Sequence, residues 1–130
     1  MLFQFSDIEP FFCHKTEKFD VKIISVDEMS KILSSTVFVP CPNGFVHPET
    51  YRLYEALECG CIPIVENAYR YYDRLFPENP FLKIDKWMET KPAVKEWGTA
   101  QIKKKQEECM TWWAQHKNQL QQFFKNKINP

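Results

Sequence analysis

The chain has 130 residues, a length typical of one domain, and 44% of them are hydrophobic, which is enough apolar material for a core. Seventeen basic and seventeen acidic residues cancel, which argues against a nucleic-acid binder driven by bulk positive charge. The five cysteines are odd in number and irregular in spacing, so they exclude a fully paired disulfide scaffold and favour a reducing compartment. No segment approaches the roughly 20 apolar residues of a membrane span, so a complete chain is expected to be soluble and cytoplasmic.

The N-terminal part of the chain gives weak signals. Residues 1–20 mix phenylalanine with charge and have no clear period, so we expect a lead-in segment. A β-branched run over 21–25 predicts a strand. Asp27 is a candidate N-cap for a helix over 28–33, whose apolar residues share one face.

Two apolar runs in the first half predict neighbouring strands. The first covers 36–39 and is expected to end at Pro40, with Pro42 following. The second covers 61–65 and is apolar on both faces, which is typical of a central parallel strand covered by helices.

A loop and a helix connect these two strands. The loop over 41–47 contains the turn dipeptide Asn43-Gly44. Pro48 fits the first position of a helix, and Glu49 would then lie in its first turn. Gly60 is expected to end this helix.

The second half of the chain predicts four further features. They are an aromatic loop with a short helix over 67–76, a strand over 81–84, a helix over 86–97 that Asp85 caps and Pro92 breaks, and a long amphipathic helix over 99–127. The order of strands and helices predicts an α/β fold with a Rossmann-like parallel sheet. The expected parts are the lead-in segment 1–20, an α/β domain over 21–98 and the C-terminal helix within 99–130.

The apolar stripe of the last helix has two interpretations. It steps by three and four residues through Ile102, Gln106, Cys109, Trp113, His116, Leu120 and Phe123. The helix either lies on its own sheet or braces a second domain or partner chain.

The start of the helix after the first loop is a candidate phosphate site, because ligands of open α/β sheets bind outside the carboxyl ends of the strands. Free N–H groups at a helix start suit a phosphate, and Thr50 can add a hydroxyl. Arg52 can offer several donors to a diphosphate. Glu55 lies seven residues after Pro48, roughly 10 Å along a helix, where its carboxylate can accept the hydroxyls of a ribose.

A second interpretation of the same spacing stays open. Glu49, Arg52 and Glu55 stand three residues apart, which also fits a solvated ladder of ion pairs. No metal site is predicted, because Cys59 and Cys61 are too close for the usual zinc knuckle and no second pair has ligand spacing.

The string Thr50-Tyr-Arg-Leu-Tyr-Glu-Ala-Leu-Glu-Cys-Gly-Cys-Ile-Pro-Ile-Val65 closely resembles the donor-site signature of the exostosin-like glycosyltransferases of family 47. That signature is Ser/Thr-x-Arg-x-x-Glu-Ala-x-x-x-Gly-Cys-Ile-Pro-Val-Val. The resemblance is strong over 35–66 and looser to residue 97. The family usually carries a basic residue where Asn43 stands here.

The resemblance implies the C-terminal, donor-binding half of a GT-B fold and a UDP-sugar donor. It places Arg52 at the diphosphate and Glu55 on the ribose as the catalytic pair. The implied reaction is inverting transfer to a glycan or other hydroxyl acceptor, with no metal or other cofactor. The general base then lies on an N-terminal acceptor domain or a partner chain. If the chain is part of a longer exostosin-like protein, the Golgi lumen is its expected compartment.

Further residues at the expected strand ends are candidates for donor binding. They come from the loop over 41–47, the start of the following helix and the end of the strand over 61–65: Asn43, Gly44, His47, Glu49, Thr50 and Glu66. Two functional classes remain open. The chain is either part of an active glycosyltransferase or a non-catalytic module that binds a nucleotide sugar or a protein partner.

Overall fold

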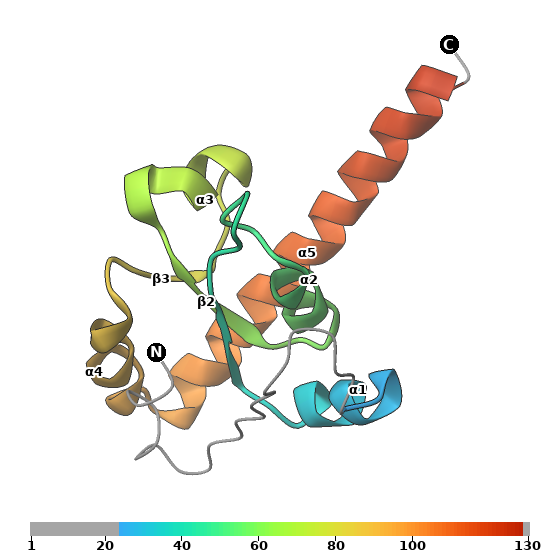
Figure 1. The fold of residues 1–130 in the computed structure, drawn as a ribbon. Coiled ribbons are helices and arrows are strands. Elements are labelled where there is room, and N and C mark those ends of the chain that lie inside the picture. The colour runs from blue at the N-terminus through green and yellow to red at the C-terminus, as the bar shows by residue number, and fades with distance from the viewer. Residues whose placement is uncertain (1–23, 129–130) are drawn as a thin grey trace.

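Three short parallel strands form the sheet of this protein, in the spatial order β1-β2-β3 (Figure 1). A computed structural model describes residues 24–128. The strands are β1 (Phe38–Cys41), β2 (Ile62–Glu66) and β3 (Leu82–Ile84). The first four residues of β2 are buried, which confirms the predicted central parallel strand. The α/β class and the long C-terminal helix are likewise confirmed.

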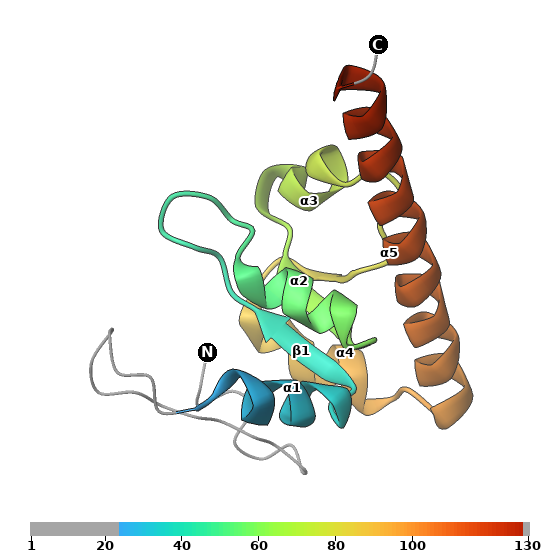
Figure 2. The same ribbon diagram turned by 90° about the vertical axis from the view of Figure 1, so that its right-hand side faces the viewer.

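Helices connect and cover these strands. They are α1 (Val26–Ser34), α2 (Tyr51–Glu58), α3 (Tyr71–Leu75), α4 (Thr90–Lys95) and α5 (Thr99–Ile128), with 3₁₀ turns η2 (Ala68–Arg70) and η3 (Trp87–Glu89). Helix α2 contacts β1 and β2, and α5 contacts α2 and β2. Figures 1 and 2 show α5 crossing the whole molecule, with its last turns projecting beyond the other elements.

The start of α1 differs from the expectation. Ser25 is the N-cap, and it forms a capping box in which its hydroxyl accepts the N–H of Glu28 while the Glu28 carboxylate accepts the N–H of Ser25. Asp27 is therefore not the cap but lies in the first turn. Of the strand expected over 21–25, Ile24 and Ser25 belong to no strand, and 21–23 and the lead-in segment 1–20 lie outside the described residues.

Strand β1 does not end at Pro40, as the sequence suggested, but continues to Cys41. Pro40 lies opposite Ile64 in the parallel register. The extension is tolerated because β1 is the edge of the described sheet, and an edge strand needs N–H donors on one side only.

The core lies between the sheet and the pair α2 and α5. Val39, Cys41 and Val65 contribute from the strands, and Leu53 and Leu57 contribute from α2, each with at most 4% of its surface exposed. The described cysteines are all free thiols. Burial raises the pKa of Cys41 to about 12, so this thiol stays protonated inside the core.

The helix predicted over 86–97 forms as two pieces. The 3₁₀ turn η3 passes into α4 between Glu89 and Thr90, both with helical backbone, and Pro92 does not break the helix. Pro92 is the third residue of α4, where a helix has no internal acceptor for its N–H. Asp85 is not the cap either: its backbone N–H donates to the Glu89 carboxylate.

The two halves of α5 have different environments. In the first half, Cys109 is buried, the Trp112 indole N–H donates to the Pro77 carbonyl at 3.3 Å, and the Gln106 amide donates to the Gly60 carbonyl. In the last turns, Leu120, Phe123, Phe124 and Ile128 are 43–74% exposed. The helix therefore packs on its own domain as far as His116 and Lys117, which contact Phe76 and Glu58, and its last turns project.

Candidate functional site

The carboxyl ends of β1 and β2 lie side by side, because Cys41 pairs with Val65 in the parallel register. The loop 42–50 follows β1 and extends away from the sheet (Figure 2). Glu66, the last residue of β2, and the turn η2 after it lie at the same edge. The structure thus gathers at one edge the segments in which the sequence placed its candidate residues.

Gly44 is essential to the shape of this loop. Its backbone N–H donates to the Pro48 carbonyl at 3.2 Å, which closes the loop. A Cβ atom at Gly44 would lie 2.6 Å from the carbonyl oxygen of His47 and 3.2 Å from Cγ2 of Thr50. The loop backbone therefore approaches residue 44 too closely for any side chain.

Helix α2 begins later than the sequence predicted. Thr50 is the N-cap, with extended backbone, and Tyr51 is the first helical residue. Pro48 and Glu49 lie before the helix, because the Pro48 carbonyl bonds Gly44 and Tyr72 instead of serving a helical turn. The expected distance of about 10 Å between the helix start and Glu55 shrinks to about 6 Å at 1.5 Å per residue. Gly60 ends the helix as predicted, with a positive φ of 73°.

Arg52 and Glu55 share one face of α2, as their spacing predicted. Arg52 Nη1 lies 3.0 Å from Glu55 Oε2, and the two side chains are 34% and 47% exposed. The same nitrogen approaches Met29 Sδ on α1 at 3.2 Å. The guanidinium also lies near the carboxyl end of β1, where it partly opposes the rise that burial gives to the pKa of Cys41. The ion pair between Arg52 and Glu55 thus exists in this structure.

Glu49 does not join that pair. Its carboxylate accepts a hydrogen bond from the Tyr71 hydroxyl of α3. This bond, followed by desolvation, raises the pKa of Tyr71 to about 12. The neighbouring Tyr72 is buried, and its hydroxyl donates to the Pro48 carbonyl at 2.9 Å. Tyr71 and Tyr72 therefore donate hydrogen bonds to two consecutive loop residues, Glu49 and Pro48.

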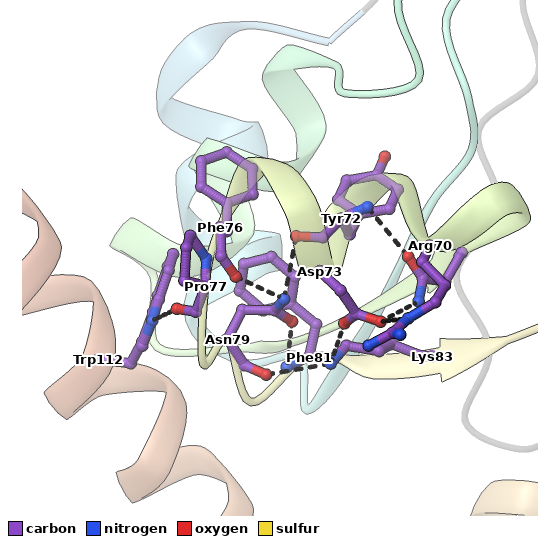
Figure 3. A network of polar contacts seen from close by, with 10 residues as sticks. Arg70, Tyr72, Asp73, Phe76, Pro77, Asn79, Phe81, Lys83 and Trp112 are labelled. Atoms are coloured by element: carbon purple, nitrogen blue, oxygen red, sulfur yellow. Dashed lines mark hydrogen bonds and ion pairs between the residues drawn. The ribbon is translucent and has the colours of Figure 1, made fainter.

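A polar network anchors α3 to the sheet (Figure 3). Asn67 accepts the backbone N–H of Tyr72 and donates to the Asp73 carboxylate. Lys83 of β3 lies 2.7 Å from the other Asp73 oxygen. Lys83 and Asn67 together lower the pKa of Asp73 to about 2. The buried Asn79 amide donates to the carbonyls of Tyr72 and Phe76, which fixes the end of α3.

The remaining candidates lie at the same edge with fewer contacts. Asn43 and His47 are exposed on the loop, and Thr50 is half-buried and makes no side-chain capping bond. Glu66 is half-buried at the end of β2, opposite Ile84 of β3. Tyr69 is 93% exposed and has a positive φ of 54°.

Two surface hollows lie away from this edge. An open hollow of about 540 Å³ is bordered by Glu78, Pro80 and Trp112, and a smaller one of about 140 Å³ lies between α2 and α5. None of the predicted site residues lines either hollow. Within residues 24–128, no group of three or more His, Cys, Asp or Glu side chains is arranged to hold a metal ion. No helix in that range has the length and apolar character needed to cross a membrane.

The strand, loop, helix and strand that carry the signature lie together at this edge, in the arrangement that the exostosin-like resemblance implied. A family model described as the RXYLT1 C-terminal domain matches residues 12–130, and the chain belongs to this family. RXYLT1 is an exostosin-family xylosyltransferase, which confirms the resemblance seen in the sequence. No curated protein and no solved structure matches the chain.

The residues that fix the shape of the site were not predicted from the sequence. The bonds of Tyr71 and Tyr72 to loop 42–50 were not predicted. The adjacent tyrosine pair is visible in the sequence, but its partners lie 22 and 24 residues away. No local pattern indicates such pairings.

Proposed function

We propose that this chain binds the nucleotide-sugar donor of a glycosyltransferase, with UDP as the nucleotide, as the donor-binding half of a GT-B fold. The observation that carries the proposal is the position of the signature pair. Arg52 and Glu55 lie half-exposed on one face of α2, beside the carboxyl end of β1, in a chain of the exostosin-like class. Ligands of open parallel sheets bind at this edge.

The start of α2 supports a diphosphate there. Its first turn contains no acidic residue, and the Thr50 hydroxyl makes no capping bond within the helix. The free N–H groups and the partial positive charge of a helix start favour an anion. Arg52 has five N–H donors, so it can bond phosphate oxygens with groups that Glu55 does not use. As negative charge develops on the departing UDP, these fixed donors stabilise it.

We assign the carboxylates three residues before and three residues after Arg52 to the two sugar rings of the donor. Glu55 can exchange its contact with Arg52 for the hydroxyls of the ribose, and Glu49 can accept hydroxyl hydrogens of the transferred sugar. The exchange at Glu55 costs little, because a partly exposed ion pair contributes only about 0.2–1 kcal/mol. His47, Asn43, Gly44, Thr50 and Glu66 complete the proposed site as loop and rim residues.

The proposed reaction is inverting transfer to a glycan or other hydroxyl acceptor, with no metal or other cofactor. The general base is then supplied by an N-terminal acceptor domain or by a partner chain. Because the family is that of a xylosyltransferase, UDP-xylose is the first donor to test. Family membership also leads us to propose the Golgi lumen as the compartment.

A titration with UDP followed by two-dimensional ¹H–¹⁵N NMR tests the binding proposal. Chemical-shift changes are expected to centre on residues 42–55. A saturating titration that moves only distant residues, or none, contradicts the donor site.

The second functional class is a non-catalytic module that holds the donor. Inverting transfer requires a general base, and in the first class that base comes from an acceptor domain or partner chain; a chain that works without one belongs to the second class. The two classes differ in one measurement. A transferase forms free UDP from UDP-xylose faster when a hydroxyl acceptor is present. A binding module binds UDP but forms no UDP from UDP-xylose.

A further inference from the structure

Within the proposed donor site, we infer that Tyr71 is a positioning residue: its hydroxyl fixes the Glu49 carboxylate so that the remaining carboxylate oxygen accepts hydroxyl hydrogens of the donor's sugar. The inference rests on the proposed function and assigns a specificity role to a residue outside the signature. Tyr71 lies on α3, and it reaches Glu49 across 22 positions of the chain.

The bond between Tyr71 and Glu49 is not needed to hold the loop backbone. Gly44 already closes the loop onto Pro48, and the Tyr72 hydroxyl already fastens Pro48 to α3. The Tyr71 hydroxyl adds a restraint on a side chain instead. A carboxylate held by one hydrogen bond loses rotational freedom before a ligand arrives, so binding the ligand costs less conformational entropy.

The residues that support Tyr71 are firmly packed. Tyr72, the next residue, has no exposed surface, and its ring meets Tyr71 edge-on at 5.5 Å and Phe81 at 6.4 Å. The Asn67 amide and the pair of Asp73 with Lys83 tie α3 to the sheet (Figure 3). The position of the Tyr71 hydroxyl is therefore set by the sheet and not by the loop that it contacts.

The order of charged groups along the chain matches the order of groups in the donor. Glu49, Arg52 and Glu55 follow one another at three-residue intervals. A nucleotide sugar carries sugar, diphosphate and ribose in the same order. With Arg52 at the diphosphate and Glu55 at the ribose, Glu49 is left on the side of the transferred sugar. Only one of its oxygens, Oε2, bonds Tyr71.

The Tyr71 hydroxyl stays protonated near neutral pH and so remains a hydrogen-bond donor. The hydrogen bond to Glu49 is the main cause that raises the pKa of Tyr71 to about 12. Tyr71 therefore keeps its proton, and Glu49 keeps an ordered hydrogen-bond donor.

The test separates the sugar from the nucleotide. Calorimetry measures the dissociation constants of UDP, UDP-xylose, UDP-glucose and UDP-N-acetylglucosamine for the wild-type chain and for Tyr71→Phe. The sugar increment is the ratio of the UDP constant to that of the tightest UDP-sugar. Tyr71→Phe is expected to leave UDP affinity within about twofold and to lower the sugar increment about fivefold, the effect of one typical hydrogen bond.

Two further variants exclude a merely structural role. Tyr72→Phe removes the neighbouring bond to the Pro48 carbonyl, and it is expected to weaken UDP and UDP-sugars alike. Combining Tyr71→Phe with Glu49→Gln is expected to cost no more sugar increment than the larger single change, because both changes remove the same function.

The inference is overturned if Tyr71→Phe weakens UDP and the UDP-sugars equally, or if it leaves the sugar increment unchanged. It is also overturned if the wild-type chain binds no UDP-sugar more tightly than UDP. These results differ from failure of the proposed function itself, in which the wild-type chain binds no UDP. That last result overturns both.

Discussion

Replacing Trp112 with alanine is expected to destabilise this domain by about 2–4 kcal/mol, whereas the same change at Phe124 is expected to cost less than about 0.5 kcal/mol. Both residues lie on α5, but in different halves of it. The comparison therefore tests which part of the helix belongs to the domain core.

The larger figure follows from the contacts of Trp112. Its ring stacks on His116 at 4.9 Å and meets Phe81 at 5.1 Å and Phe76 at 5.7 Å. Each aromatic pair contributes about 0.5–1.5 kcal/mol beyond the area it buries, and the indole N–H adds a hydrogen bond to the Pro77 carbonyl. Trp112 is only half-buried, so the sum stays below the roughly 3–5 kcal/mol of a fully buried tryptophan.

Phe124 provides the matched control. Its ring is 58% exposed, and it contacts the ring of Phe123, one residue away on the same helix. Urea unfolding followed by circular dichroism gives the free energy of unfolding for both variants and the wild type. Equal losses at the two positions, or a larger loss at Phe124, would refute the division of α5 into a packed and a projecting half.

Two further predictions concern the loop and the network behind it. Gly44→Ala is expected to displace loop 42–50 and weaken UDP binding about tenfold, because its Cβ would lie 2.6 Å from the His47 carbonyl oxygen. Gly98→Ala, with no atom within 4 Å of the added Cβ, is expected to leave binding unchanged, and similar affinities of the two variants would contradict the account of the loop. Lys83 and Asn67 hold the pKa of Asp73 at about 2, below its usual 3.8, so this carboxylate stabilises the fold above pH 3.8 and the contribution is lost as the pH falls toward about 2. Urea midpoints measured between pH 5 and pH 2 are expected to fall less steeply for Asp73→Asn than for the wild type, and parallel curves would contradict this assignment.

The parts of the fold that the sequence predicted well are those set by local patterns. The apolar run over 61–65 gave the central strand, because burial on both faces leaves no polar alternation. Gly60 marked the end of α2, since a positive φ there favours glycine. The period of the last helix predicted α5 closely, from Thr99 to about residue 127.

The errors arose where a tertiary contact overrides a local preference. Pro48 fits a helix start, but its carbonyl is held by Gly44 and Tyr72, so α2 begins at Tyr51. Pro40 was expected to end β1, yet an edge strand accommodates it. Asp27 lost the cap position to Ser25, whose capping box with Glu28 satisfies two backbone groups.

The candidate site was predictable in part for the same reason. The shared face of Arg52 and Glu55 follows from helical spacing and is confirmed. The link between Glu49 and Tyr71 depends on how α3 packs against the loop, which no spacing along the chain encodes. Donor binding by these residues stays a prediction.

Calorimetry with UDP on two variants of α2 tests the central claim most directly. Glu55→Ala removes the proposed ribose acceptor, and Glu58→Ala removes a carboxylate one turn further along α2 that pairs with Lys117. Loss of two hydrogen bonds to a carboxylate is expected to weaken UDP binding by roughly 2–4 kcal/mol in Glu55→Ala, whereas Glu58→Ala should bind as the wild type does. An unchanged UDP affinity in Glu55→Ala would contradict the donor site and leave Arg52 and Glu55 as a surface ion pair.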